Sequence, residues 1–345
     1  MTAYPPMRDI LDTVNTWIAA DRPIALATVA ATWGSAPRAV GAHMAIAPDG
    51  DSAAIAGSVS GGCVEAAVIR EALEVIADGT PRLLHFGVSD DQAWDVGLAC
   101  GGQISVLVER LDGAWWTLAA ARMTSDLPTT TLTLLDGDHI GAKALYDADG
   151  LSLYSAAGFP HESSFADAVI AARRATRATI AGHDLLLDTS RPRPHLIVVG
   201  GAHVALLLAE MGLRLDYRVT VIDPRRVFAT PERFPAPIAI THEYPDRAFA
   251  RIGLDADSYI AVLTHDPKID DKALIAALPS AARYVGVMSS RKTHAARLER
   301  LRAAGIDDGQ IARIHTPIGI DIGASTPEEI ALSIMAQIVA VRRAK

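Results

Sequence analysis

The amino-acid sequence predicts an α/β protein: an amino-terminal mixed α+β domain followed by a Rossmann-like domain with a doubly wound parallel sheet. The chain has 345 residues, enough for about two domains. Two prolines within residues 190–194 interrupt the pattern. After them, short apolar strands alternate with helices, which is typical of a parallel sheet covered on both faces. We therefore divide the chain into residues 1–190 and residues 191–345.

In the first domain, periodicity and turn residues predict two helices and several strands. A helix that begins at Cys63 should end at Gly79, a residue type that favours helix ends. The other elements expected here are a helix at 7–20, strands at 24–32, 103–111, 129–135 and 142–147, and a hairpin turn at 48–51.

In the second domain, apolar strands and helices follow one another regularly. The last helix should begin after Thr326, with Pro327 in its first turn and Glu329 completing a capping box. The other elements expected are strands at 195–199, 218–222, 259–263 and 283–287, and helices at 204–213, 272–278 and 292–304.

Composition excludes several classes of function. The net charge is −8 and no basic run stands out beyond residues 342–345, which argues against nucleic acid or an anionic membrane as a partner. The amino terminus lacks a signal-peptide pattern, and no apolar run reaches the roughly 18 residues of a membrane span. Two cysteines form no disulfide framework, so we expect a cytoplasmic protein.

Both cysteines stand beside a pair of glycines, whose missing side chains let a ligand approach the backbone. Cys63 follows Ser60, Gly61 and Gly62 at the expected start of a helix, where the helix dipole favours a thiolate. Arg38, in a separate loop of turn-forming residues, is the expected anion contact in this half.

The second cysteine, Cys100, precedes Gly101 and Gly102 in a loop before a strand. Three interpretations of the two thiols are open: inert apolar residues, metal ligands, or residues for sulfur chemistry and ligand contact. The glycine context favours the third, and no paired Cys or His spacing supports a metal site. We expect the two cysteine loops to converge on one pocket, because loops at element ends gather around ligands.

In the second half, Gly200, Gly201, Ala202 and His203 lie between an expected strand and helix. Asp223 follows at the end of the next strand, about 20 residues later, which is the layout of a Rossmann dinucleotide site. Alanine occupies the position of the second glycine, which disfavours a standard dinucleotide. A nucleotide, a pterin dinucleotide and a purely structural turn are all open interpretations.

Further polar residues follow the strands at the edge where such sheets bind ligands. Arg225 could hold a phosphate, and His265 and Asp266 follow the strand expected at 259–263. We expect Gly201, Asp223 and Arg225 to line a pocket at this edge.

Taken together, these motifs resemble the XdhC/CoxI family over nearly the whole chain. The motifs that carry the resemblance are GSAPR at 34–38, GSVSGGCVE at 57–65, FGVSD at 86–90, WDVGLACGG at 94–102, GGAHV at 200–204, VIDPR at 221–225, THD at 264–266, YVG at 284–286 and PIGID at 317–321. This sequence departs from the family pattern at Ala202 and at residues 289–291, where the family commonly has Gly-Ser-Arg.

The resemblance implies an accessory protein for molybdenum hydroxylases such as xanthine dehydrogenase. Such a protein binds molybdenum cofactor (molybdopterin), promotes its sulfuration with sulfur from a cysteine desulfurase, and delivers it to the apoenzyme. By the same resemblance, Cys63 and Cys100 would hold cofactor or sulfur, with the neighbouring glycines shaping the pocket. A homodimer is one possible state.

Two further functions stay open at this point. The Rossmann half also suits an NAD(P)-dependent oxidoreductase, for which His203, His265, Asp266 or His294 would supply a general acid or base. A scaffold without a ligand is the third alternative. The cofactor chaperone is the leading hypothesis, so whether the protein is itself an enzyme is left undecided.

Overall fold

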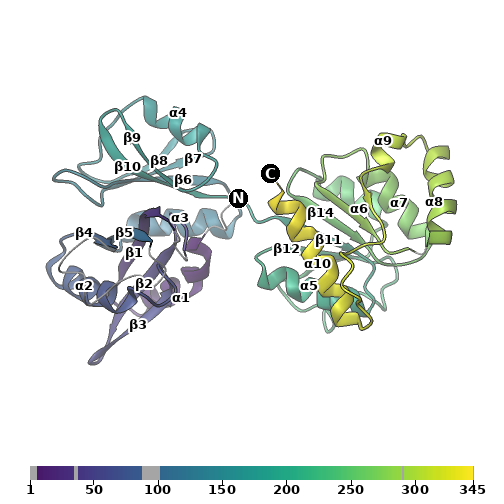
Figure 1. Cartoon of the computed structure of the whole chain (residues 1–345), viewed down its shortest axis with the longest axis horizontal. Coiled ribbons are helices and arrows are strands. Elements are labelled where there is room, and N and C mark those ends of the chain that lie inside the picture. The colour runs from purple at the N-terminus through teal and green to yellow at the C-terminus, as the bar shows by residue number, and fades with distance from the viewer. Residues whose placement is uncertain (1–5, 35–37, 88–101, 290, 345) are drawn as a thin grey trace. The chain divides into compact units, whose positions relative to one another are not determined.

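The structure is a computed structural model that describes residues 6–34, 38–87, 102–289 and 291–344 (Figure 1). Contacts divide the chain into two units, residues 2–192 and residues 193–345. The α/β class, with a Rossmann-like second unit, is confirmed. No helix within the described ranges is long and apolar enough to cross a bilayer.

The first unit contains two antiparallel sheets, each of five strands. One sheet has the order β3-β2-β1-β5-β4 and the other the order β8-β7-β6-β10-β9. The strands are β1 (Ala25–Trp33), β2 (His43–Asp49), β3 (Ser52–Gly57), β4 (Arg82–Phe86), β5 (Gln103–Arg110), β6 (Thr129–Leu134), β7 (Lys143–Asp147), β8 (Ser152–Ser155), β9 (Thr176–Ile180) and β10 (His183–Ser190).

Helices cover these sheets with apolar faces. Helix α2 (Glu65–Asp78) buries Val68, Ala72 and Val75 against the first sheet and ends at Gly79, whose φ of 76° is left-handed. The remaining elements are the short helix η1 (Pro6–Ile10), α1 (Leu11–Ala19), α3 (Gly113–Thr124) and α4 (Ser164–Ala171). The tryptophans of α3 are fully buried in a second apolar cluster, to which residues of η1, α1 and the first sheet also belong.

Two buried polar contacts join the sheets of the first unit. Lys143 of β7 forms an ion pair with Glu109 of β5 at 2.6 Å, and both side chains are buried. His43 of β2 contacts Asp188 of β10 through Nε2 at 2.8 Å, and its Nδ1 lies 3.0 Å from the Thr28 hydroxyl. Because charges taken out of water need partners, these contacts fix how the two sheets pack.

The second unit is one parallel sheet of six strands with the order β13-β12-β11-β14-β15-β16. Leu196 and Val198 of β11 face one apolar cluster and Ile197 and Val199 face another, so both faces are covered. The strands are β11 (His195–Val199), β12 (Arg218–Ile222), β13 (Ala239–Thr241), β14 (Ser258–Val262), β15 (Tyr284–Val287) and β16 (Ile314–His315).

Helices α5 (His203–Arg214) and α10 (Pro327–Arg343) pack on one face of this sheet. The other face is covered by α6 (Pro245–Ile252), α7 (Pro267–Ala277) and α8 (Arg291–Ala303), with α9 (Asp308–Ile311) beside α8. The capping box predicted at Thr326 and Glu329 is confirmed. The chain runs outward from β11 through β12 and then crosses to β14, so the order reverses between β11 and β14. In such sheets ligands bind at the carboxyl ends of the strands at this switch point.

Candidate functional site

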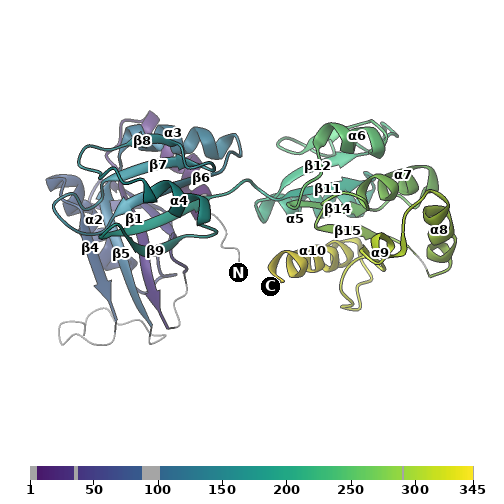
Figure 2. The ribbon, with the colours of Figure 1, turned by 90° about the horizontal axis from the view of Figure 1, so that it is seen from above.

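The loops singled out in the first unit leave one edge of its first sheet. Antiparallel register pairs Trp33 with Gln103, Phe86 with Ile104, and Met44 with Gly57. The loops after β1, β3 and β4 therefore start at the edge where β5 begins, and Figure 2 shows β4 and β5 reaching it together. Cys100 and Gly101 lie outside the described residues. The loop that carries them begins after β4 and returns at β5, so both of its ends lie at this edge.

The carboxylate of Glu65 organises the loop that carries the described cysteine. It accepts hydrogen bonds from the Ser58 hydroxyl at 2.7 Å and from the Ser60 amide at 2.9 Å, and also from the Ser60 hydroxyl. The amides of Gly61 and Gly62 donate to it at 3.0 and 2.8 Å. Glu65 thus holds four polar positions of the loop, and the amides of both glycines are engaged within the protein.

The loop leads directly into α2 through Ser60, which is completely buried. The Ser60 hydroxyl accepts from the amides of Cys63 and Val64, both at 3.0 Å. Val64 is the N-cap residue, so the helix begins at Glu65 and the start predicted at Cys63 was two residues too early. The reason is that Ser60 and Glu65 satisfy the backbone of residues 60–64 without helical hydrogen bonds.

Cys63 is a free and solvent-exposed cysteine at the end of this loop. Its exposure contradicts the alternative that it is an inert residue of the core. The loop around it adopts one conformation because Gly61 and Gly62 have φ values of 82° and 119°, which side-chain-bearing residues rarely adopt. The structure therefore presents a thiol on a loop fixed by hydrogen bonds.

Two more side chains lie at the same edge. Arg38 donates from Nε to the Ser58 carbonyl at 3.1 Å, and its side chain is about one third exposed, with Asp9 at 3.7 Å. Trp33, the last residue of β1, is 70% exposed. The structure thus brings Arg38 to the loop of Ser60, Gly61, Gly62 and Cys63.

Sequence reasoning missed Glu65 and Trp33 as parts of this site. The sequence shows Glu65 only as a negative charge near a thiol, although a glutamate just after Ser-Gly-Gly is well placed to accept the free amides of such a loop. Burial raises the pKa of Glu65, but hydrogen bonds from Ser60, Ser58 and the Ser60 amide outweigh it and lower the pKa to about 2. The carboxylate is therefore ionised at neutral pH.

In the second unit, both glycines of the turn after β11 are required by the protein's own packing. A side chain on Gly200, whose φ is 105°, would meet the Thr264 side chain at 2.6 Å. One on Gly201 would meet the Phe228 carbonyl at 2.6 Å. Thr264 follows β14, so this turn lies at the switch point.

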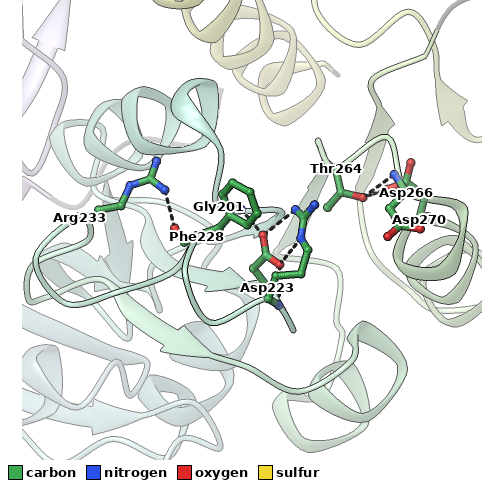
Figure 3. A network of polar contacts seen from close by, with 8 residues as sticks. Gly201, Asp223, Phe228, Arg233, Thr264, Asp266 and Asp270 are labelled. Atoms are coloured by element: carbon green, nitrogen blue, oxygen red, sulfur yellow. Dashed lines mark hydrogen bonds and ion pairs between the residues drawn. The ribbon is translucent and has the colours of Figure 1, made fainter.

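Asp223 is completely buried beside this turn (Figure 3). Oδ2 accepts from the Gly201 amide and from the terminal nitrogen of Arg225, and Oδ1 accepts from Nε and the amide of Arg225, all at 2.9 Å. The fingerprint predicts an acid open to a ribose, whereas here four hydrogen bonds fill the carboxylate. Burial raises the pKa of Asp223, but these bonds outweigh it and lower the pKa below its usual range.

The other predicted residues of this half have different environments. Ala202 is the N-cap residue of α5. His203 is exposed, with Nε2 4.0 Å from Glu328. His265 is exposed with a φ of 63°, and Asp266 caps α7 by accepting from the Lys268 amide at 2.9 Å.

Sequence reasoning also missed a buried pair beside these residues. Asp270 accepts from the Thr264 hydroxyl and from Arg297 at 2.9 Å, and the Asp270 and Arg297 side chains are both buried. Figure 3 shows Thr264, Asp266 and Asp270 together next to the turn of Gly201 and Asp223. No local pattern marks Arg297, because it reaches Asp270 from a different helix.

The parallel sheet with a glycine turn at its switch point defines the second unit as a Rossmann domain, and the first unit adds an exposed cysteine on a fixed glycine loop. Residues 196–338 match the model of the XdhC Rossmann domain, and residues 17–87 match that of the XdhC and CoxI family. The chain belongs to the XdhC/CoxI family.

Known relatives share about a quarter of its residues. It is 27% identical to the molybdenum cofactor insertion chaperone PaoD of Escherichia coli over 92% of this chain and 83% of that one. It is 26% identical to the uncharacterized protein YqeB of Escherichia coli over 93% of this chain, but spans only 44% of that protein's length. A probable xanthine dehydrogenase component of Bacillus subtilis is 24% identical over 92% of this chain and 93% of its own length.

A crystal structure of a xanthine dehydrogenase from Bacillus halodurans has a similar fold. The TM-score is 0.78, with 24% identity, 96% of this chain covered and 95% of the other. At this identity the likeness supports the fold alone.

Proposed function

We propose that this protein binds molybdenum cofactor and supports its insertion into a molybdenum hydroxylase of the xanthine dehydrogenase type. The observation that carries the proposal is the exposed Cys63 thiol on the loop that Glu65 fixes, with Arg38 at the same edge. The likeness to a protein named as a molybdenum cofactor insertion chaperone supports the cargo and the class of partner.

The residues at this edge fit such a cargo in kind. A thiolate is a soft donor that suits a metal bound by sulfur, and a guanidinium suits the phosphate of a pterin. Cys63 is already exposed and its loop is already fixed, so binding would require little ordering of the protein. Glu65 would act as a positioning residue, because it holds the loop without facing the cargo through a free oxygen.

We further propose that Cys63, together with Cys100, holds the cofactor during sulfuration or carries the sulfur for it. A cysteine desulfurase would supply the sulfur, and the apoenzyme would receive the loaded cofactor. The protein would act as a chaperone in the cytoplasm, alone or as a homodimer, and would turn over no small substrate of its own. NAD(P)-dependent oxidation is the rival function.

Replacement of Cys63 with serine should lower activation of a partner apoenzyme by about tenfold or more while the melting temperature stays nearly unchanged. The physical reason is that an exposed sulfur contributes little packing, so its loss should change stability by less than about 0.5 kcal/mol. Activation is measured as hydroxylase activity after incubation of apoenzyme with cofactor and each variant. Full activation by the Cys63→Ser variant would contradict the role of the thiol.

Arg38→Gln should also weaken activation, by an amount that falls as the salt concentration rises, because the guanidinium is expected to attract an anionic cargo. Arg70→Gln is the matched control, since Arg70 is exposed on α2 beyond the loop and loses the same charge. Equal effects of the two substitutions would point to net charge rather than to a site at this edge.

A further inference from the structure

Arg225 is held in one orientation at the carboxyl edge of the parallel sheet. Its Nε and one terminal nitrogen donate to the two oxygens of Asp223, both at 2.9 Å. Its guanidinium carbon lies 4.4 Å from the centre of the Phe228 ring, so the ring covers one face of the group. One edge and one face of the guanidinium are therefore fixed by the protein.

The segment that carries Phe228 is itself tied down. The Phe228 carbonyl accepts from Arg233 at 2.9 Å, and the Ala229 carbonyl is 2.8 Å from Nε2 of His242. Figure 3 shows Arg233 meeting the Phe228 carbonyl next to Gly201 and Asp223. Arg225 thus rests on a supported loop rather than on a free strand end.

The opposite edge of the guanidinium is open. The Arg225 side chain is 35% exposed, whereas its partner Asp223 is completely buried. A guanidinium carries five N–H donors in a planar fork that matches two phosphate oxygens. Asp223 uses donors on one edge only, so the remaining donors can receive an anion from outside.

Neighbouring acids do not compete for this open edge. Asp266 and Asp270 both raise the pKa of Arg225 through their charge, after the larger effect of Asp223. Asp266 is engaged as the cap of α7, and Asp270 is buried in its pair with Arg297. The charge that faces outward at this point is therefore positive.

The same contacts disfavour a ligand with a free ribose diol. In Rossmann domains that bind NAD, the acid at this position accepts from the ribose hydroxyls, and an arginine nearby accommodates a 2′-phosphate. Here both oxygens of Asp223 are filled by Arg225 and Gly201. A diol would have to displace these hydrogen bonds, whereas a phosphate would leave them in place.

We propose that the Rossmann half binds a ligand that carries a phosphate monoester, and that Arg225, positioned by Asp223 and Phe228, recognises that group. Two ligands share this chemistry: a nucleotide with a ribose 2′-phosphate, and a pterin cargo with a terminal phosphate. The first is independent of the proposed function, and the second rests on it.

Calorimetry on the full chain tests the proposal with NADP⁺, NAD⁺ and molybdopterin. The wild type should bind NADP⁺ or molybdopterin about tenfold or more tightly than NAD⁺, as charge-assisted bidentate contacts imply. Binding of NADP⁺ identifies the ribose phosphate, and binding of molybdopterin alone identifies the cargo. No preference for either over NAD⁺ would overturn the proposal.

Arg225→Gln should abolish the preference, and Arg226→Gln, which removes the same charge from the exposed neighbouring residue, should preserve it. Because Arg225→Gln leaves Asp223 buried without its partner, the double variant Asp223→Asn with Arg225→Gln provides a neutral site that should fold and also lack the preference. A preference that survives in the double variant would contradict the role of Arg225. Cys63→Ser should leave NADP⁺ binding unchanged, so failure here and failure of the proposed function are distinguishable.

Discussion

Replacement of Lys143 with methionine should lower the free energy of unfolding of the first unit by about 3–5 kcal/mol, the cost of removing one partner of a buried ion pair. Lys143 Nζ lies 2.6 Å from Glu109 and 3.1 Å from the Thr133 hydroxyl, and it sits 5.0 Å from the centre of the Trp115 ring. Methionine keeps most of the volume, so the loss reports the charge. Denaturant unfolding at neutral pH measures it.

A double variant provides the control for this result. Lys143→Met combined with Glu109→Gln leaves no buried charge, so it should be clearly more stable than Lys143→Met alone. If the two were equally unstable, the loss in the single variant would reflect packing rather than an uncompensated carboxylate.

The pH dependence of the Lys143→Met variant follows from Glu109. Burial raises the pKa of Glu109, although Lys143 opposes this, and without Lys143 the pKa should rise further. A raised pKa means that stability is full below the unfolded value of about 4.5 and is lost as pH rises towards the folded value. The gap between wild type and variant should therefore narrow near the unfolded value, and a gap that stays constant would contradict this origin.

Replacement of Glu65 with glutamine should destabilise the first unit by about 1–3 kcal/mol, the range for hydrogen bonds to a charged group that is lost. It should also lower activation of the partner enzyme, because the amides of Gly61 and Gly62 lose their acceptor and the loop of Cys63 loses its fixed conformation. Hydrogen exchange at residues 60–64, together with unfolding, measures the change. Cys63→Ser, by contrast, should leave exchange in this loop unchanged.

The stabilisation by Glu65 has a defined pH window. Its pKa in the folded protein is lowered to about 2, so its contribution is present above the unfolded value of about 4.5 and is lost as pH falls towards 2. The difference between wild type and Glu65→Gln should therefore shrink between about pH 4.5 and 2. Glu74→Gln is the matched control on the same helix, because its exposed pair with Arg82 should contribute less than about 1 kcal/mol. A loss in Glu74→Gln equal to that in Glu65→Gln would argue against a special role for Glu65.

Local signals in the sequence predicted elements well where the signal and its cause lie close together. The capping box of α10 needs only Thr326 and Glu329, and the end of α2 needs only Gly79. The strands of the parallel sheet were predicted because burial on both faces makes each one continuously apolar, as in β11. The start of α7 at Pro267 was predicted five residues too late, because Asp266 was expected to contact a ligand and instead caps the helix.

Contacts between distant residues could not be predicted in this way. Glu109 and Lys143 lie in different sheets, and neither position has a pattern that marks a buried charge. The spacing of Gly200 and Asp223 predicted the turn and the acid, but spacing does not show that Arg225 fills that acid. The glycines beside Cys63 indicated a special loop, whereas the part played by Glu65 depends on hydrogen bonds that only the structure shows.

The molybdenum and pterin content of the protein, purified from a host grown with molybdate, tests the proposed function most directly. The wild type should carry molybdenum and pterin in equal amounts, and Cys63→Ser should carry much less of both while it melts at nearly the same temperature. Bound nicotinamide in place of pterin would favour the oxidoreductase. Equal molybdenum and pterin in wild type and Cys63→Ser, or neither in the wild type, would contradict a cofactor-binding role for the Cys63 loop.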